Sequence, residues 1–314
     1  MIDNTNESKT PRNEEFQDIP KFEGVASVNI KAINPNNEKL RKFGWNVPED
    51  APEPNYIIQK EKDGKVQTMM RLRLLAQIQD FEEKPIVALD FWCRPEVQGN
   101  KEGTKWRIID PYVRTAWATT AEVKAKAVPQ YSNGPADISY PYKPCHPGEE
   151  EVLTFAFKYL NITPLRTYDK KANAWVLTSN PGRLAFDDWA KFCKGDVKEY
   201  AEWLAKQPNN CVKVILGVKT TEDNKSYQTF LNSGYIGNGA LPDRTTGEYQ
   251  SARKLIDKFM ESHSESEYSF SAEPVKRWGV TATEVVEVSS NPFGESVTTT
   301  DDLSDDGDLP FSDM

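Results

Sequence analysis

The chain has 314 residues with 39 Lys and Arg against 48 Asp and Glu, which gives a formal net charge of −9. It lacks the run of about 18 apolar residues that a membrane-spanning helix needs, and its polar first residues lack the basic start and apolar core of a signal peptide. We therefore expect a soluble cytoplasmic protein with no membrane partner, built as one elaborated domain.

The first elements predicted along the chain are an arm and a β-hairpin. Residues 1–24 are rich in Asn, Glu and Lys and predict a flexible N-terminal arm. The run at 56–58 leads through Asp63-Gly64, a favoured hairpin turn, into a strand from Val66. Apolar residues alternate along this strand, so Arg71 and Arg73 should share its other face. Two further strands are predicted at 86–92 and 104–109.

The second half of the chain switches between helical and strand spacing. Helices are predicted at 149–160 and at 187–206, the latter interrupted at Gly195-Asp196. Strands follow at 212–219 and 227–231, and a last helix at 248–261. We divide the chain into the arm, a core over 25–262 with a helical insertion at about 149–206, and a disordered acidic tail over 263–314.

The fold class that these elements predict is α+β, mainly antiparallel β. Short antiparallel strands with a helical insertion fit an OB-fold-like barrel followed by a disordered acidic tail. A generic α+β domain fits equally, because periodicity cannot decide whether a sheet closes.

Metal and enzyme signatures are sparse. The four cysteines are scattered without a Cys-x-x-Cys pair, and the only histidines are His146 and His263, so we expect reduced structural cysteines and no zinc. The phosphate-binding Gly-rich loop and the Gly-x-Ser-x-Gly elbow are both missing. The acidic pairs Glu82-Glu83 and Asp187-Asp188 could hold Mg²⁺ in a nuclease, but such pairs more often cap helices or face solvent. We predict no catalysis and no cofactor.

Aromatic residues alternate with basic ones through the body, a pattern that suits single-stranded nucleic acid because cations follow the phosphates while rings stack on bases. Tryptophans can also fill a core, as we expect for Trp189 and Trp203 on helical stretches, and both readings stay open for Trp106. A loop or turn after Pro111 should present Arg114 and Trp117. The predicted DNA-binding residues are Arg71, Arg73, Trp92, Arg94, Lys105, Trp106, Arg107, Tyr112, Arg114, Trp117, Tyr168, Lys219 and Tyr227.

The last 36 residues, 279–314, hold nine acidic residues and no Lys or Arg, so the remaining body is neutral, with 39 basic and 39 acidic residues. Such a segment is too poor in apolar residues to fold alone. Its end places an apolar tip behind a run of carboxylates. The residues predicted to bind partner proteins are Asp305, Asp306, Asp308, Leu309, Pro310 and Phe311.

This tail resembles that of single-stranded-DNA-binding proteins from bacteria and tailed phages. It differs in that Ser312-Asp313-Met314 follow Phe311, whereas Phe is the last residue in the bacterial pattern. The resemblance implies an OB-fold core that coats and protects single-stranded DNA without sequence preference in phage DNA replication, recombination and repair. It also implies a host-cytoplasmic location, no catalysis, and recruitment of replication or recombination proteins through the tail.

Two other classes of protein remain open, and so does the oligomeric state. The first is a virion or scaffold component whose acidic tail only keeps it soluble. The second is a metal-dependent nucleic-acid enzyme.

Overall fold

The computed structural model describes residues 19–62, 65–109, 113, 115–125, 143–162, 166–169, 174–177, 188–231, 240–241 and 247–279. The chain divides into two units, residues 1–278 and residues 279–314. All the elements below belong to the first unit, and among its described residues no helix is both long and apolar enough to cross a membrane.

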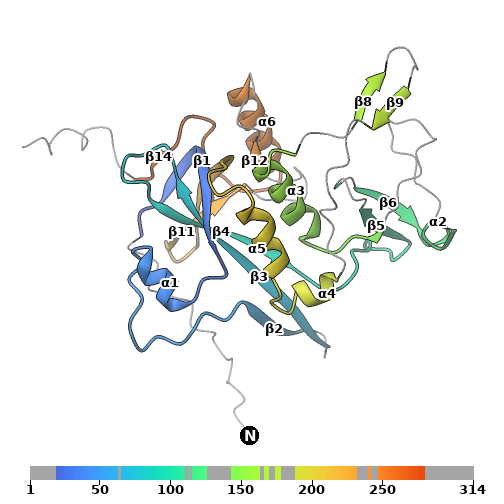
Figure 1. The fold of residues 1–314 in the computed structure, drawn as a ribbon, viewed down its shortest axis with the longest axis horizontal. Coiled ribbons are helices and arrows are strands. Elements are labelled where there is room, and N and C mark those ends of the chain that lie inside the picture. The colour runs from blue at the N-terminus through green and yellow to red at the C-terminus, as the bar shows by residue number, and fades with distance from the viewer. Residues whose placement is uncertain are drawn as a thin grey trace, which may run out of the picture. The chain divides into compact units, whose positions relative to one another are not determined.

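The described residues form a nine-stranded sheet and two smaller ones (Figure 1). Antiparallel pairing joins β11 to β10, β10 to β1, β1 to β3, and β3 to both β2 and β4. These strands are β1 (Phe22–Ile33), β2 (Ile57–Lys62), β3 (Lys65–Ile78), β4 (Ile86–Cys93), β10 (Val212–Thr220) and β11 (Ser226–Phe230). The predicted α+β class with mainly antiparallel strands is confirmed.

Shorter strands complete the sheets. β12 (Ala240–Leu241) and β13 (Tyr268–Phe270) pair with β10, and β14 (Lys276–Arg277) pairs with β1. A second sheet has the order β6-β5-β7, and β8 pairs with β9. The bounds of these five strands are β5 (Lys105–Ile109), β6 (Thr115–Thr119), β7 (Lys143–Pro144), β8 (Arg166–Asp169) and β9 (Ala174–Leu177).

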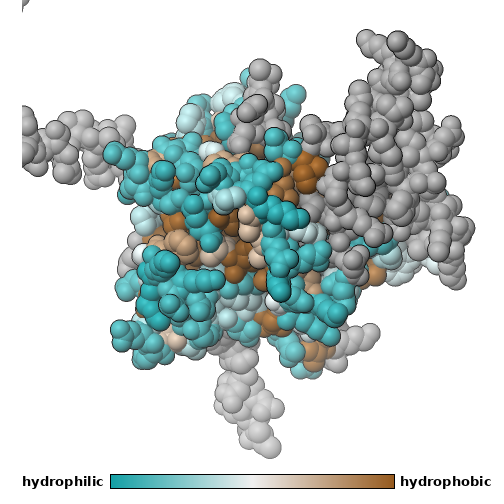
Figure 2. Space-filling model, viewed as in Figure 1, coloured by the Kyte–Doolittle hydropathy of each residue, from teal (hydrophilic) through white to brown (hydrophobic). Residues whose placement is uncertain are grey.

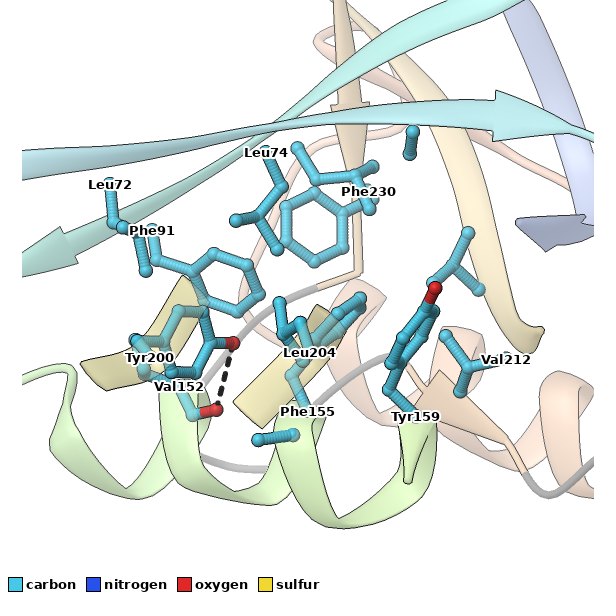
Figure 3. Packing of buried hydrophobic residues seen from close by; sticks show 14 of the residues in the cluster. Leu72, Leu74, Phe91, Val152, Phe155, Tyr159, Tyr200, Leu204, Val212 and Phe230 are labelled. Carbon is cyan, nitrogen blue, oxygen red and sulfur yellow. Dashed lines mark hydrogen bonds between the residues drawn. The ribbon is translucent and has the colours of Figure 1, made fainter. Parts of the chain in front are cut away.

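The main core lies on one face of β3 and β4, because alternate residues of a strand project to the same side. Leu72 pairs across strands with Phe91, and Leu74 with Leu89, and all four are fully buried. Helices α3 (Glu149–Tyr159) and α5 (Lys198–Ala205) pack against this face, as Figure 3 shows. The helical core residues labelled there are Val152, Phe155, Tyr159, Tyr200 and Leu204.

Among the described residues, a second hydrophobic cluster covers one end of the other face of β3 and β4. There α1 (Asn37–Lys42) and the segment after it pack on Leu75, forming this cluster with Ala32, Leu40, Trp45 and Val47. In the view of Figure 2, most of the described surface is hydrophilic, and hydrophobic side chains show between the hydrophilic ones.

Strands β4 and β11 lie at the two ends of the paired series β11-β10-β1-β3-β4, and their side chains approach each other. The ring centroids of Phe91 and Phe230 are 5.2 Å apart, edge to face. Four antiparallel steps separate the two strands, so both run in the same direction. Among the described residues, no backbone hydrogen bonds pair β4 with β11. The sheet is therefore not closed by hydrogen bonds between these two strands.

Most predicted elements are present. The hairpin forms β2 and β3, whose pair Lys62 and Lys65 flanks the predicted turn. The stretch 187–206 contains α4 (Trp189–Phe192) and α5, interrupted at Gly195, where φ is +99°. Trp189 and Trp203 are buried, as expected. The last predicted helix is α6 (Glu248–Met260).

The structure differs from the predictions in three places. β1 begins at Phe22, inside the predicted arm. Residues 115–119 form β6 and lead into α2 (Thr120–Ala125), where we expected a loop or turn. Strands β13 and β14 lie within the predicted tail, so the folded body extends to Trp278. This last segment crosses β1 at Gly24, where a Cβ would lie 2.7 Å from the Glu273 carbonyl oxygen.

Candidate nucleic-acid interface

Three neighbouring strands place two aromatic rings on either side of a guanidinium group. The Arg71 backbone N–H donates to the Tyr56 carbonyl at 2.8 Å, and Arg71 pairs across strands with Trp92. Side chains of directly paired residues project to the same face. The Arg71 guanidinium carbon lies 5.8 Å from the Tyr56 ring centroid, and Trp92 is 46% exposed. The row Tyr56–Arg71–Trp92 thus crosses the part of the sheet that α1 leaves uncovered.

Arg71 is a partly buried cation whose nearest acidic neighbour, Asp90, is already paired with Arg73. Its Nε is buried and has no hydrogen-bond partner, and the guanidinium has no ion pair among the described residues. Burial, together with the positive charge of Arg73, lowers the pKa of Arg71. Its neighbour Tyr56 stays neutral, because burial raises its pKa to about 12, and its hydroxyl donates to the Pro35 carbonyl at 2.6 Å. An anion bound at Arg71 would supply the hydrogen-bond acceptor that Nε lacks.

Arg73 shares this face, as predicted, but it is already paired. Its Nε and Nη2 donate to the two carboxylate oxygens of Asp90 at 2.8 and 2.7 Å, and its guanidinium carbon lies 5.8 Å from the Trp45 ring centroid. Arg73 is only 9% exposed. Burial opposes ionisation of Asp90, but the charge and hydrogen bonds of Arg73 hold the Asp90 pKa below its ordinary value. Because Arg73 is buried and paired with Asp90, we do not include it in the candidate interface, and its predicted role in DNA binding stays a prediction.

A cavity of about 380 Å³ adjoins Trp92 at the end of β4. The turn before α3 approaches the strand closely here: Gly148 has φ +85°, and a Cβ on it would lie 2.3 Å from the Trp92 carbonyl oxygen. Only glycine fits such a position. The lining residues are Trp92, Arg94, Gln98, Arg107, His146, Pro147, Gly148, Glu150 and Glu151.

Arg107 on β5 connects this cavity to a second exposed ring. Its guanidinium donates to Glu150 and, at 2.9 Å, to the Thr115 hydroxyl, and it lies 5.9 Å from the ring centroid of Trp117. Trp117 is 43% exposed. Arg94, at the other side of the cavity, is exposed and has no hydrogen bond or ion pair from its guanidinium among the described residues.

We call Tyr56, Arg71, Trp92, Arg94, Arg107 and Trp117 the aromatic–basic band. Five of these six residues were predicted from the sequence, and Tyr56 was missed. The sequence feature that could have identified Tyr56 is the Asp63-Gly64 turn. A two-residue turn pairs residue 62 with residue 65, and the same register places residue 56 opposite Arg71.

Trp106 lies outside the band. It pairs with Ala118 while the next residue, Arg107, pairs with Trp117, so Trp106 projects to the opposite face of β5. Its Nε1 donates to the Thr120 hydroxyl at 3.1 Å, and its ring packs against Gly99. Lys105 is exposed and alternates onto the same face as Arg107.

Lys219 and Tyr227 form a separate cluster. They pair across β10 and β11, and the Lys219 ammonium lies 4.9 Å from the ring centroid of Tyr268. Tyr227 is near the start of β11 and Trp92 near the end of β4, so the two clusters lie at opposite ends of these strands. The cavity beside Lys219 is also lined by Glu222, Asp223 and Glu267, which suits a polyanion poorly.

The other predicted residues have side chains outside the described part of the chain. Tyr168 has its backbone in β8, opposite Trp175, but its side chain lies outside the described residues, as do Tyr112 and Arg114. The predicted partner-binding residues of the tail also lie outside them: Asp305, Asp306, Asp308, Leu309, Pro310 and Phe311.

The described residues hold no group of three or more His, Cys, Asp and Glu side chains that could bind a metal ion. Burial raises the pKa of Cys145 and of Cys193 to about 12, so both thiols are protonated at neutral pH. No family model, curated protein or solved structure matches the chain.

Proposed function

We propose that the protein binds single-stranded DNA along the aromatic–basic band, with little sequence preference and without catalysis. One observation carries the proposal: Arg71 and Arg94, two cations with no ion pair among the described residues, alternate with the exposed rings of Trp92 and Trp117 on one continuous surface. Cations that contact phosphates, set between rings that stack on bases, are what a single strand requires.

We also propose that the body is an OB-type barrel. The strands β1, β3 and β4 form a meander, and the helices α3 to α5 lie between β4 and β10 in the chain, together with α2 and the short strands β5 to β9. Then β10 returns beside β1, and β11 lies next to β4. This is the strand order of the five-stranded OB fold, which binds oligonucleotides over its second and third strands. Here those strands are β3 and β4, which carry Arg71 and Trp92.

The energetics of the band favour a single strand over a duplex. Each base stacked on an aromatic ring contributes about 1–3 kcal/mol, and stacking needs an unpaired base whose face is free. In a duplex the base faces are covered by their neighbours, so only the phosphate contacts would remain. Because every base has a stacking face, most positions along the strand should be bound without regard to sequence.

The acidic tail fits the same role. We propose that its carboxylates compete with DNA for the band, and that its end recruits replication or recombination proteins through Asp305, Asp306, Asp308, Leu309, Pro310 and Phe311. The process in which we place the protein is phage DNA replication, recombination and repair, on the strength of the tail's sequence.

Quenching of tryptophan fluorescence by poly(dT) tests the proposal, with duplex DNA of equal length as the comparison. We expect quenching with dT at moderate salt and much weaker binding of the duplex. Equal affinity for both, or no binding of either, would refute the proposal and favour a virion or scaffold component. Incubation with Mg²⁺ or Mn²⁺ gives the third outcome, since cleavage of the DNA would identify a metal-dependent enzyme.

A further inference from the structure

We propose that the cavity beside Trp92 receives one base of the bound strand and prefers guanine. This inference rests on the proposed function, because it assumes that a single strand lies along the aromatic–basic band. It goes beyond that function by giving one position of the strand a base preference.

The cavity has the size and the wall that a base needs. Its volume of about 380 Å³ falls within the range of roughly 300–1,000 Å³ typical of small-ligand sites. Trp92 is among its lining residues and is 46% exposed, and we propose that its ring stacks on the base. The exposed guanidinium of Arg94 at the rim can contact the phosphate of the same nucleotide.

Two lining side chains are free to contact a base edge. The Gln98 backbone is fixed, since its N–H donates to the Cys145 carbonyl at 2.9 Å and its carbonyl accepts from Arg107 at 2.8 Å, yet its side-chain amide has no hydrogen bond among the described residues. The Glu151 carboxyl likewise has no hydrogen bond or ion pair within the described part of the chain. Glu150, by contrast, already accepts from Arg107 and Thr115.

Guanine matches these groups better than the other bases do. An ionised carboxylate offers two acceptor oxygens in a plane. Guanine presents two adjacent donors on its Watson–Crick edge, N1–H and the N2 amino group, so both oxygens of Glu151 can be satisfied at once. Adenine, cytosine and thymine each offer a single donor group on this edge. The Gln98 amide can donate to guanine O6.

The electrostatic surroundings of Glu151 increase the benefit of such a partner. Burial and the negative charge of Glu150 raise its pKa to about 7, although Arg107 lowers it. Ionised Glu151 is therefore insufficiently solvated, and two donors from a base would replace the missing water.

The test measures the affinity of the full-length protein for repeat oligonucleotides of equal length. Their repeating units are TTTG, TTTA, TTTC and TTTI, with oligo(dT) as the reference, so that every binding register contains the test base. Lithium buffer prevents guanine quadruplexes, and the pH is set about one unit above the Glu151 pKa of about 7 so that the carboxylate is ionised. Inosine lacks the N2 amino group but keeps N1–H.

We expect TTTG to bind about tenfold more tightly than oligo(dT), as for a bidentate base contact, with TTTI intermediate and TTTA and TTTC near the reference. In Glu151→Gln the affinities for TTTG and oligo(dT) should become about equal, because an amide has only one acceptor oxygen. Glu82→Gln is the matched control. It removes the same charge from an exposed residue in the turn at the other end of β3 and β4, and should keep the ratio of TTTG to oligo(dT) affinity.

The two proposals fail in different ways. Equal binding of TTTG and oligo(dT) would overturn the guanine preference and leave single-strand binding intact. A ratio that persists in Glu151→Gln would also overturn it, because the preference would then arise elsewhere. A wild-type protein that binds none of the oligonucleotides would refute the proposed function itself.

Discussion

Replacing Trp92 with Ala should weaken DNA binding more than it weakens the fold. Removal of a fully buried aromatic side chain costs about 3–5 kcal/mol of unfolding free energy. Because 46% of Trp92 is exposed, we expect a loss of about 2 kcal/mol or less. If the ring stacks on one base, the substitution removes about 1–3 kcal/mol of binding free energy, which is about 5- to 150-fold in affinity.

Trp106→Ala is the matched control, since Trp106 projects to the face of β5 away from the band and donates to Thr120 at 3.1 Å. It should lower stability at least as much and leave DNA affinity unchanged. The assays are a urea titration of each variant and the anisotropy of a labelled dT oligonucleotide. Wild-type affinity in Trp92→Ala, together with weakened binding in Trp106→Ala, would refute the assignment of the band.

Four further predictions follow from individual contacts. Arg71→Gln and Arg94→Gln should each reduce the slope of log K against log salt by about 0.7, which salt titrations of oligo(dT) binding would measure, and unchanged slopes would show that these cations do not contact phosphates. Asp90→Asn removes the charge that pairs with buried Arg73 and should lower the unfolding free energy by about 2–4 kcal/mol in urea, less than for a fully buried pair because the Asp90 side chain is 28% exposed; a loss under about 1 kcal/mol would contradict a structural role for the pair. Because the Glu151 pKa is raised, the folded state binds more protons than the unfolded state between pH 4.5 and about 7, so stability falls as pH rises through this window. Thermal melts should therefore show Glu151→Gln more stable than wild type above pH 7 and nearly equal below pH 4.5, and a gap that does not change with pH would contradict this. Truncation after Gly279 should tighten single-strand binding, with a gain that shrinks at high salt; equal affinity with and without the tail would show that it only solubilises the protein.

Local patterns predicted the parts of the fold whose causes are local. The alternation along β3 and the Asp63-Gly64 turn indicated both the strand and its face, and Arg71 lies where they place it. The turn also fixes the register that brings Tyr56 beside Arg71, so this residue could have been found from the sequence.

Contacts between distant segments could not be predicted in this way. Asn29 looks like a surface residue, but it is buried in β1, where its amide donates to the Tyr159 hydroxyl at 3.0 Å and to the Asn210 carbonyl at 2.7 Å. Arg73 was assigned to DNA binding because no local pattern shows that Asp90 lies opposite it. Both partners are known only once the strands have been paired.

The candidate site shows the same division. The sequence singled out aromatic and basic residues by type. The faces on which they lie depend on the pairing of β5 with β6, which places Trp106 and Trp117 on opposite faces. Gln98 and Glu151 gave no sequence signal, because their potential role comes from the cavity formed where β4 meets the turn before α3.

Photo-crosslinking to a dT oligonucleotide that contains 5-iododeoxyuridine tests the central claim most directly, because the halogenated base reacts with aromatic rings on which it stacks. Peptide mapping of the crosslinked full-length protein should find the crosslink at Trp92 or Trp117. Unmodified competitor DNA should suppress the crosslink at either residue. Crosslinks confined to the cluster of Lys219 and Tyr227, or saturable binding without a crosslink at either tryptophan, would contradict the account.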